Sequence, residues 1–232
     1  MRNILVVDDD KEIANLISIY LKNEGFNIRC AHDGEEALKL LNDPDESFDL
    51  IVLDIMMPKM DGLEVCRQVR DTSSVIPILM LSAKTEDMDK ILGLMTGADD
   101  YMIKPFNPLE LTVRVKTLLR RTFQYNTDTR SQDDAVLRIQ DVEINRSTHR
   151  VIADGSDIQL TGREFDILSL LASHPGRVFS AEEIFQRVWK EKYYVSNNTV
   201  MVHISNLRDK LEKELGYKLI QTVWGVGYKI DA

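Results

Sequence analysis

Four short apolar segments of the chain, residues 4–7, 50–53, 78–81 and 101–103, each end in polar residues that could take part in chemistry. In chain order these polar residues are Asp8 with Asp9, Asp54, Ser82 and Lys104. Apolar segments of this length are typical of buried strands. The carboxyl ends of parallel strands meet at one edge of a sheet, where ligands bind. We therefore expect the five side chains to converge on a single site.

Three carboxylates at one sheet edge repel one another unless a cation or a proton relieves the repulsion. Their hard oxygen ligands suit Mg²⁺, with Mn²⁺ as the alternative. A metal ion there could orient a phosphoryl group, and Asp54 could be the nucleophile that forms an acyl phosphate. Lys104 offers a positive charge to the phosphate and Ser82 a hydroxyl donor. Solvated strand ends would explain any one of these residues, but not five in register.

The elements that position this site alternate regularly up to residue 121. Apolar residues at helical spacing follow the strands near residues 13–21, 35–41, 63–70, 87–95 and 108–121. Five strand–helix units in a row predict an α/β fold with a doubly wound parallel sheet in a first domain, residues 1–121.

The rest of the chain has a different pattern. Residues 122–135 show no sustained apolar period, which indicates a linker. A second domain over residues 136–232 follows. Short strands are expected at residues 136–139, 142–144, 150–152 and 158–160, and then three helices, of which two begin at the Thr161 and Ser180 caps and the third runs from Asn197 to Leu215. A glycine-containing hairpin over residues 218–230 completes an α+β winged helix-turn-helix.

Composition narrows the class of protein. The net charge of -9 argues against a uniformly basic nucleic-acid coat and against a membrane-surface protein. Residues 187–229 nevertheless hold eight Lys or Arg against four acidic residues, a local excess that would suit an anionic partner. No apolar run approaches the ~20 residues of a membrane-spanning helix. We expect a cytoplasmic protein without membrane insertion.

Four motifs carry a resemblance in the first domain: Val-Val-Asp8-Asp9, Leu-Asp54-Ile-Met-Met-Pro58-x-Met-Asp61-Gly62, Leu-Ser82-Ala and Gly-Ala-Asp99-Asp100-Tyr101-x-x-Lys104-Pro105-Phe106. Together they resemble the flavodoxin-like receiver domain of two-component response regulators. The resemblance implies that Asp54 accepts phosphate from a sensor histidine kinase. It implies metal ligands from Asp8, Asp9, Asp54 and the main-chain carbonyl of Met56. It further implies Ser82 and Tyr101 as a switch pair, Lys104 as a phosphate contact, and a cis bond before Pro105.

The switch has a physical rationale and a predicted output. Phosphate at Asp54 would attract the Ser82 hydroxyl, and Tyr101 would turn inward into the vacated space. Charged helix faces are ordinarily solvated, but the resembling subfamily uses such positions in salt bridges across a two-fold dimer. The candidates are Lys90, Asp99, Asp100, Glu110, Arg114, Lys116 and Arg121, with Lys90 pairing Glu110 and Asp100 pairing Arg114 between subunits. Exposed ion pairs contribute about 0–1 kcal/mol each, so they would set geometry more than affinity.

Three motifs of the second domain, Leu160-Thr-x-x-Glu164-Phe165-x-x-Leu168, His203-Ile-x-x-Leu207-Arg208-x-Lys210-Leu211 and Gln221-Thr222-Val223-Trp224-Gly225-x-Gly227-Tyr228, resemble the OmpR/PhoB class of response regulators, with a weaker similarity to VanR-type regulators. This implies a transcription regulator that binds promoter double-stranded DNA and works with RNA polymerase. Its third helix would enter the major groove. The candidate DNA contacts are Asn198, Thr199, His203, Ser205, Asn206, Arg208, Lys210, Thr222 and Trp224.

Some of these assignments have alternatives. His203 is open to a second interpretation as a half-buried core residue. Asn198 and Trp224 stand where class members often have Arg, so a guanidinium contact to the minor groove is in doubt. A single protomer should then bind DNA weakly and depend on dimerisation.

The sequence favours a phosphorylation-activated transcription factor that dimerises through its receiver and catalyses only its own phosphorylation and dephosphorylation. Two other hypotheses remain. A Mg²⁺-dependent phosphotransferase or phosphohydrolase would often carry a second acid two residues after its nucleophile, where this chain has Met56, and no P-loop is present. A regulator that works without phosphate would not need the complete acidic set.

Overall fold

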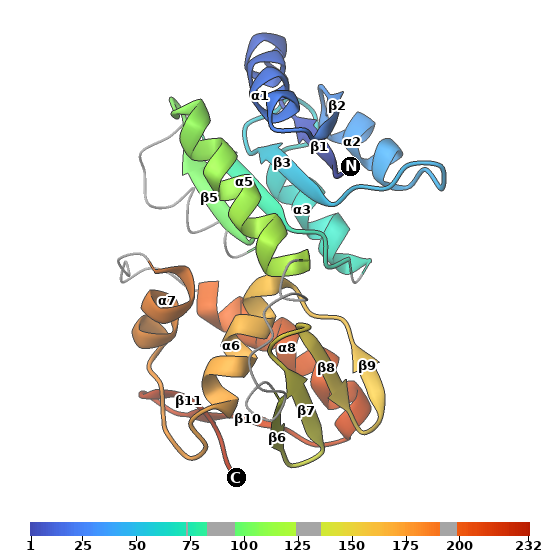
Figure 1. The fold of residues 1–232 in the computed structure, drawn as a ribbon. Helices are drawn as coiled ribbons and strands as arrows, with labels where there is room; N and C mark the ends of the chain where they lie inside the picture. The colour runs from blue at the N-terminus through green and yellow to red at the C-terminus, as the bar shows by residue number, and fades with distance from the viewer. Residues whose placement is uncertain (73, 83–95, 124–135, 191–198) are drawn as a thin grey trace. The chain divides into compact units, whose positions relative to one another are not determined.

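The chain forms two compact units, Met1–Arg120 and Arg121–Ala232, in the computed structural model shown in Figure 1. The structure describes residues 1–72, 74–82, 96–123, 136–190 and 199–232, without the side chains of residues 121–123. The expected helix over residues 87–95 and most of the expected linker, from residue 124 on, lie outside the described residues. The last helix of the first unit continues to Phe123, two residues into the segment expected to be linker.

The first unit is built on a five-stranded parallel sheet. Its strands are β1 (Asn3–Val7), β2 (Asn27–Ala31), β3 (Leu50–Asp54), β4 (Ile78–Ser82) and β5 (Asp100–Ile103). Their spatial order is β2-β1-β3-β4-β5, and each neighbouring pair is parallel. This order is that of flavodoxin-like folds, whose ligands bind at the carboxyl ends of the strands. The fold class expected from the sequence is confirmed.

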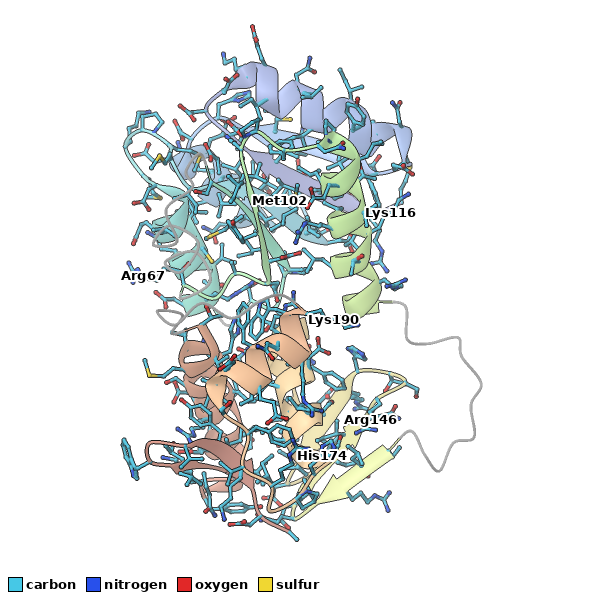
Figure 2. The ribbon with its side chains drawn as sticks, turned by 90° about the vertical axis from the view of Figure 1, so that its left-hand side faces the viewer. Arg67, Met102, Lys116, Arg146, His174 and Lys190 are labelled. Atoms are coloured by element: carbon cyan, nitrogen blue, oxygen red, sulfur yellow. The ribbon has the colours of Figure 1, made fainter. Side chains whose placement is uncertain are left out.

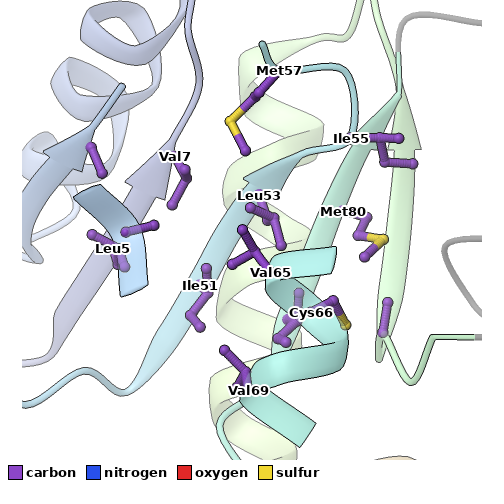
Figure 3. Close-up of a cluster of buried hydrophobic side chains, with 14 of the residues drawn as sticks. Leu5, Val7, Ile51, Leu53, Ile55, Met57, Val65, Cys66, Val69 and Met80 are labelled. Carbon is purple, nitrogen blue, oxygen red and sulfur yellow. The ribbon is translucent and has the colours of Figure 1, made fainter. Parts of the chain in front are cut away.

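Helices cover both faces of this sheet because side chains alternate between its faces along each strand. The helices are α1 (Lys11–Asn23), α2 (Gly34–Leu41), α3 (Gly62–Asp71) and α5 (Pro108–Phe123). Leu5, Ile51 and Leu53 pack against α2 and α3 in one cluster of buried side chains, part of which is drawn in Figure 3. Ile4 and the other alternate residues pack against α1 and α5 in a second cluster, which includes Met102 of β5, labelled in Figure 2.

The second unit begins with an antiparallel meander. Its strands are β6 (Val136–Ile139), β7 (Val142–Asn145), β8 (Arg150–Ala153) and β9 (Ser156–Ile158). The expected strand at residues 158–160 was placed too late. Asp154 and Gly155 have φ of 45° and 78°, the signature of a two-residue hairpin turn. Pairing therefore resumes at once at Ser156.

The meander is followed by a winged helix-turn-helix. The helices are α6 (Gly162–Ala172), α7 (Ala181–Trp189) and α8 (Thr199–Leu215), and β10 (Ile220–Val223) pairs with β11 (Gly227–Ile230) to form the wing. Thr161 and Glu164 make the expected capping box at the start of α6. The wing is fixed to the loop before α7 by paired backbone hydrogen bonds of 2.9 Å between Phe179 and Tyr228.

Candidate functional site

Three acidic side chains meet at the carboxyl edge of the parallel sheet. Asp8 directly follows β1 and Asp54 ends β3, which is paired with β1. Asp8 and Asp54 are buried, whereas Asp9 is exposed. One oxygen from each of the three carboxylates lies within 4.8 Å of the others. The sheet order therefore produces the predicted acidic cluster.

Lys104 completes this cluster from the end of β5. Its Nζ lies 2.7 Å from Asp8 Oδ2 and 3.1 Å from Asp54 Oδ2. The Lys104 backbone N–H donates to the carbonyl of Ser82, at the end of β4. The bond between Lys104 and Pro105 is cis, as the receiver resemblance implied. One ammonium group thus bridges two buried carboxylates that come from strands β1 and β3.

The electrostatics of the cluster favour a proton or a second cation. Burial raises the pKa of Asp54 to about 6, with a further rise from Asp8, against the lowering effect of Lys104. Burial likewise raises the pKa of Asp8 above its ordinary value. Burial alone would lower the pKa of Lys104, but its hydrogen bond to Asp8 and the charges of both carboxylates raise it overall. One ammonium therefore does not fully compensate the two buried acids.

The residues present fit a divalent cation. Asp54 Oδ1 is buried and has no hydrogen-bond partner within the described part of the chain. A buried carboxylate oxygen without a partner is costly, and a metal ion or a phosphoryl group would satisfy it. Three carboxylates supply the hard oxygen donors that Mg²⁺ prefers.

The loop after β3 passes very close to Asp54. The Gly62 backbone N–H donates to the Ile55 carbonyl over 2.9 Å, and a Cβ at Gly62 would lie only 2.0 Å from the Asp54 carbonyl oxygen. Met56, whose carbonyl the resemblance assigns to the metal, lies in this loop. Asp10 was not among the predicted site residues, yet its backbone N–H donates to Asp8 Oδ1 and its side chain caps α1. An acidic residue just before a helical pattern was the available signal.

The two residues assigned to the switch are both buried. Ser82 is fully buried at the end of β4, and Tyr101 is 8% exposed on β5. Tyr101 belongs to the cluster of buried side chains that packs against α2 and α3.

Asp99 was wrongly expected on an exposed dimer face. It is buried, and its Oδ2 accepts hydrogen bonds from Arg70 Nη2 at 2.8 Å and from the Ile78 backbone N–H at 2.9 Å. Arg70 also donates to the carbonyls of Gly97, Ser74 and Ile76. The pair joins the end of α3 to the starts of β4 and β5. Arg70 could not be predicted as part of this pair, because nothing in its local pattern distinguishes it from an exposed helical arginine.

The other charged residues of the expected dimer face that the structure describes have partners within the chain. Arg114 lies 3.0 Å from Asp100 Oδ1 and 3.0 Å from Glu110 Oε1. Lys116, labelled on α5 in Figure 2, pairs with Glu24, the residue that follows α1. Lys90 and the side chain of Arg121 lie outside the described residues. The Asp100–Arg114 pair, expected between subunits, is thus present within a single chain.

In the second unit, the expectation that Thr199 and His203 face outward is wrong. Both are buried, and the His203 ring lies 5.3 Å from that of Trp189. Thr199 and His203 are four residues apart, and the same spacing leads on to the buried Leu207 and Leu211, so all four lie on one face of the helix. The buried face of α8 is therefore wider than the stripe beginning at Val200.

Two basic residues expected at DNA have intramolecular partners. Arg208 donates from Nε to the Ile220 carbonyl at 3.0 Å and from Nη2 to Thr222 Oγ1 at 2.7 Å, which ties α8 to the wing. Lys210 pairs at 2.7 Å with Glu164, which is buried. Of the remaining candidates, Ser205 and Trp224 are exposed and Asn206 is half-buried, while Asn198 lies outside the described residues.

Comparison with known proteins covers both units. The chain matches the family models for the response regulator receiver domain over residues 4–116 and for the C-terminal domain of transcriptional regulatory proteins over residues 155–230. It is 49% identical over 229 residues to the regulatory protein VanRc of Enterococcus gallinarum, covering 98% of both chains. The chain belongs to the OmpR/PhoB class of response regulators.

Other relatives agree with this assignment. This chain is 42% identical over 234 residues to the transcriptional regulatory protein ResD of Bacillus subtilis, and the match covers 98% of this chain and 95% of ResD. A solved structure of a RitR mutant matches with a TM-score of 0.64 and 25% identity over 100% of this chain and 99% of that one. A Francisella response regulator 1452 receiver domain matches with a TM-score of 0.50 and 41% identity over 53% of this chain and 99% of that one.

The response regulator is a two-component transcription regulator activated by phosphorylation, with a receiver and a DNA-binding domain. Its family consists of transcription factors rather than of classical enzymes. None of the helices in the described part of the chain is long and apolar enough to cross a membrane.

Proposed function

We propose that Asp54 is the residue that accepts the phosphoryl group, from a sensor histidine kinase in the cytoplasm. The observation that carries this proposal is Asp54 Oδ1, a buried carboxylate oxygen without a hydrogen-bond partner among the described residues. In the transfer, the P–N bond of a phosphohistidine breaks and a P–O bond to the Asp54 carboxylate forms. The histidine nitrogen keeps the bonding electron pair. Hydrolysis of the resulting acyl phosphate restores the carboxylate, so the receiver catalyses only its own phosphorylation and dephosphorylation.

The neighbouring residues divide the supporting tasks. Asp8, Asp9, Asp54 and the Met56 carbonyl would hold Mg²⁺ or Mn²⁺, whose charge would neutralise the transferred phosphoryl group. Lys104 would contact the phosphate with its Nζ, which is already 3.1 Å from Asp54. The Ser82 hydroxyl would donate to the phosphate. Tyr101, which is buried, would turn into the space that the Ser82 hydroxyl leaves.

The output we propose is receiver dimerisation followed by binding to promoter DNA. Arg114 already pairs with Asp100 and Glu110 within the chain, so dimerisation would exchange these partners between subunits, with Lys90, Lys116 and Arg121 at the same face. The residues that would contact DNA are Asn198, Ser205, Asn206, Thr222 and Trp224. RNA polymerase would then be recruited or blocked at the bound promoter.

Phosphorylation and its consequences can be measured on the full chain. We expect the wild type to gain a phosphate from acetyl phosphate in the presence of Mg²⁺, and the Asp54→Asn variant to gain none. Asp45→Asn, which changes an exposed aspartate of the same unit, is the matched control and should behave as wild type. Beryllofluoride should raise the dimer fraction and the DNA affinity of the wild type and of Asp45→Asn, but not of Asp54→Asn. The proposal fails if Asp54→Asn is phosphorylated normally, or if neither dimerisation nor DNA affinity responds to beryllofluoride.

A further inference from the structure

The tip of the wing presents apolar side chains to solvent. Trp224 is 89% exposed and Val226 is 57% exposed. A tryptophan offers about 150–250 Å² of surface and is ordinarily buried for the most part. The other tryptophan of the chain, Trp189, is buried in the second unit. The exposed position of Trp224 therefore calls for a surface that covers it.

The local backbone holds Trp224 at the tip. The Val226 backbone N–H donates to the Val223 carbonyl at 2.9 Å, which closes a turn with Trp224 and Gly225 at its centre. Gly225 has φ of 74°, a value that turns of this kind require at their third position and that glycine adopts without strain. The indole is thus carried outward by a hydrogen-bonded turn.

The base of the wing is anchored on two sides. Arg208 of α8 donates to the Ile220 carbonyl and to Thr222 of β10. On the other strand, Gly227 packs so closely that a Cβ would lie 1.9 Å from the Phe179 carbonyl oxygen. The Trp224 tip is therefore supported by strands fastened to α8 and to the loop before α7, and little ordering remains to be done on binding.

The surroundings favour DNA over a protein as the surface that covers this tip. Trp224 and Val226 together offer on the order of 300 Å², whereas a stable protein interface covers about 800 Å² on each partner. One apolar side chain is enough to open a DNA base step from the minor groove. The tip also lies within residues 187–229, where basic residues exceed acidic ones by eight to four.

We propose that Trp224 enters the minor groove of the bound promoter as an apolar wedge against a base step. This inference rests on the proposed DNA binding and names the kind of sequence that the wing selects. Pyrimidine–purine steps unstack at the lowest cost, so the wing would prefer them without a hydrogen bond to any base. Because an indole neutralises no phosphate, its contribution to affinity should not depend on salt.

The test uses the full chain with beryllofluoride and a DNA site selected by the wild type from a random double-stranded library. We expect Trp224→Ala to weaken binding about tenfold to a hundredfold, the range of base–aromatic stacking, with an unchanged salt slope. Trp224→Arg should recover part of the affinity but steepen the slope by about one. The fluorescence of a 2-aminopurine base placed at the selected pyrimidine–purine step should increase when the wild type binds, and not when either variant binds. Ile19→Ala, a half-exposed apolar residue of the first unit, is the control and should match wild type.

Each contrary outcome has a distinct meaning. Equal affinity of wild type and Trp224→Ala would overturn the wedge while leaving DNA binding intact, and lost transcription with that equal affinity would assign Trp224 to a protein partner instead. A shallower salt slope in Trp224→Ala would indicate a phosphate contact and also overturn the wedge. If the wild type selects no DNA at all, the proposed function itself fails.

Discussion

Asp54→Asn should stabilise the receiver, because the wild-type carboxylate is held where its charge is unfavourable. Its pKa rises from 3.8 to about 6 on folding, first through burial and then through repulsion by Asp8. The folded state therefore binds this proton more tightly than the unfolded state, and the stability of the folded state falls as the pH rises from about 4 to about 6. At 1.36 kcal/mol per pKa unit, the full cost above that range is about 3 kcal/mol.

The variant removes this cost. With Mg²⁺ chelated, we expect Asp54→Asn to raise the free energy of unfolding of the receiver by about 3 kcal/mol near pH 8, and by about half as much near pH 5, where the wild-type carboxyl is mostly protonated. Asp45→Asn, at an exposed position, should change stability little at either pH.

Urea unfolding can resolve the receiver from the second unit. Both tryptophans, Trp189 and Trp224, lie in the second unit, so tryptophan fluorescence follows that unit alone. Circular dichroism follows both units, and the transition that fluorescence does not report belongs to the receiver. The argument from burial would be refuted if the Asp54→Asn receiver were no more stable than the wild-type receiver near pH 8. It would also be refuted if the difference in free energy of unfolding between the two stayed constant from pH 8 down to pH 5.

Three further substitutions test the framework of the site by the same unfolding measurement. Lys104→Met removes the ammonium shared by Asp8 and Asp54 and should cost about 3–5 kcal/mol near pH 8 but less near pH 5; a pH-independent loss would point to packing instead. Gly62→Ala places a Cβ 2.0 Å from a backbone oxygen and should lower the free energy of unfolding by more than about 3 kcal/mol. The control Gly25→Ala, at a glycine with φ of 84° but open space around it, should lower it by about 1 kcal/mol. Equal losses of stability in the two variants would contradict the steric argument. Asp99→Asn should lower the free energy of unfolding by about 3 kcal/mol because it leaves Arg70 without its buried partner. The control Asp71→Asn, in an exposed pair with Arg67, should lower it by less than about 1 kcal/mol. Similar losses in the two variants would mean that the buried pair stabilises the receiver no more than the exposed one.

Much of the receiver site could be predicted because it depends on strand order and on strand ends. Asp8, Asp54 and Lys104 each lie within one residue of the end of a strand that the apolar runs identify. Parallel pairing then brings those ends to one edge. The cap at Thr161 was predictable for a similar reason, since a capping box involves only residues three apart in sequence.

The environments of the residues expected at the surface were harder to predict, because those environments come from distant parts of the chain. Asp99 is adjacent in sequence to the partly exposed Asp100, yet Arg70, 29 residues earlier, holds it in the interior. His203 and Thr199 looked like one polar face of a helix, and the packing of α8 against other elements buries both. Lys210, a predicted DNA contact, also pairs with the buried Glu164, 46 residues away.

The sequence by itself determined the two-domain order, the parallel sheet and the convergence of acids and lysine, since periodicity and strand-end chemistry are local properties and few chain paths satisfy them. Only the tertiary structure decided which charges are buried, which are paired and how far the pKa of Asp54 moves. Those properties depend on the distances and on the dielectric environment that packing creates between residues far apart in the chain.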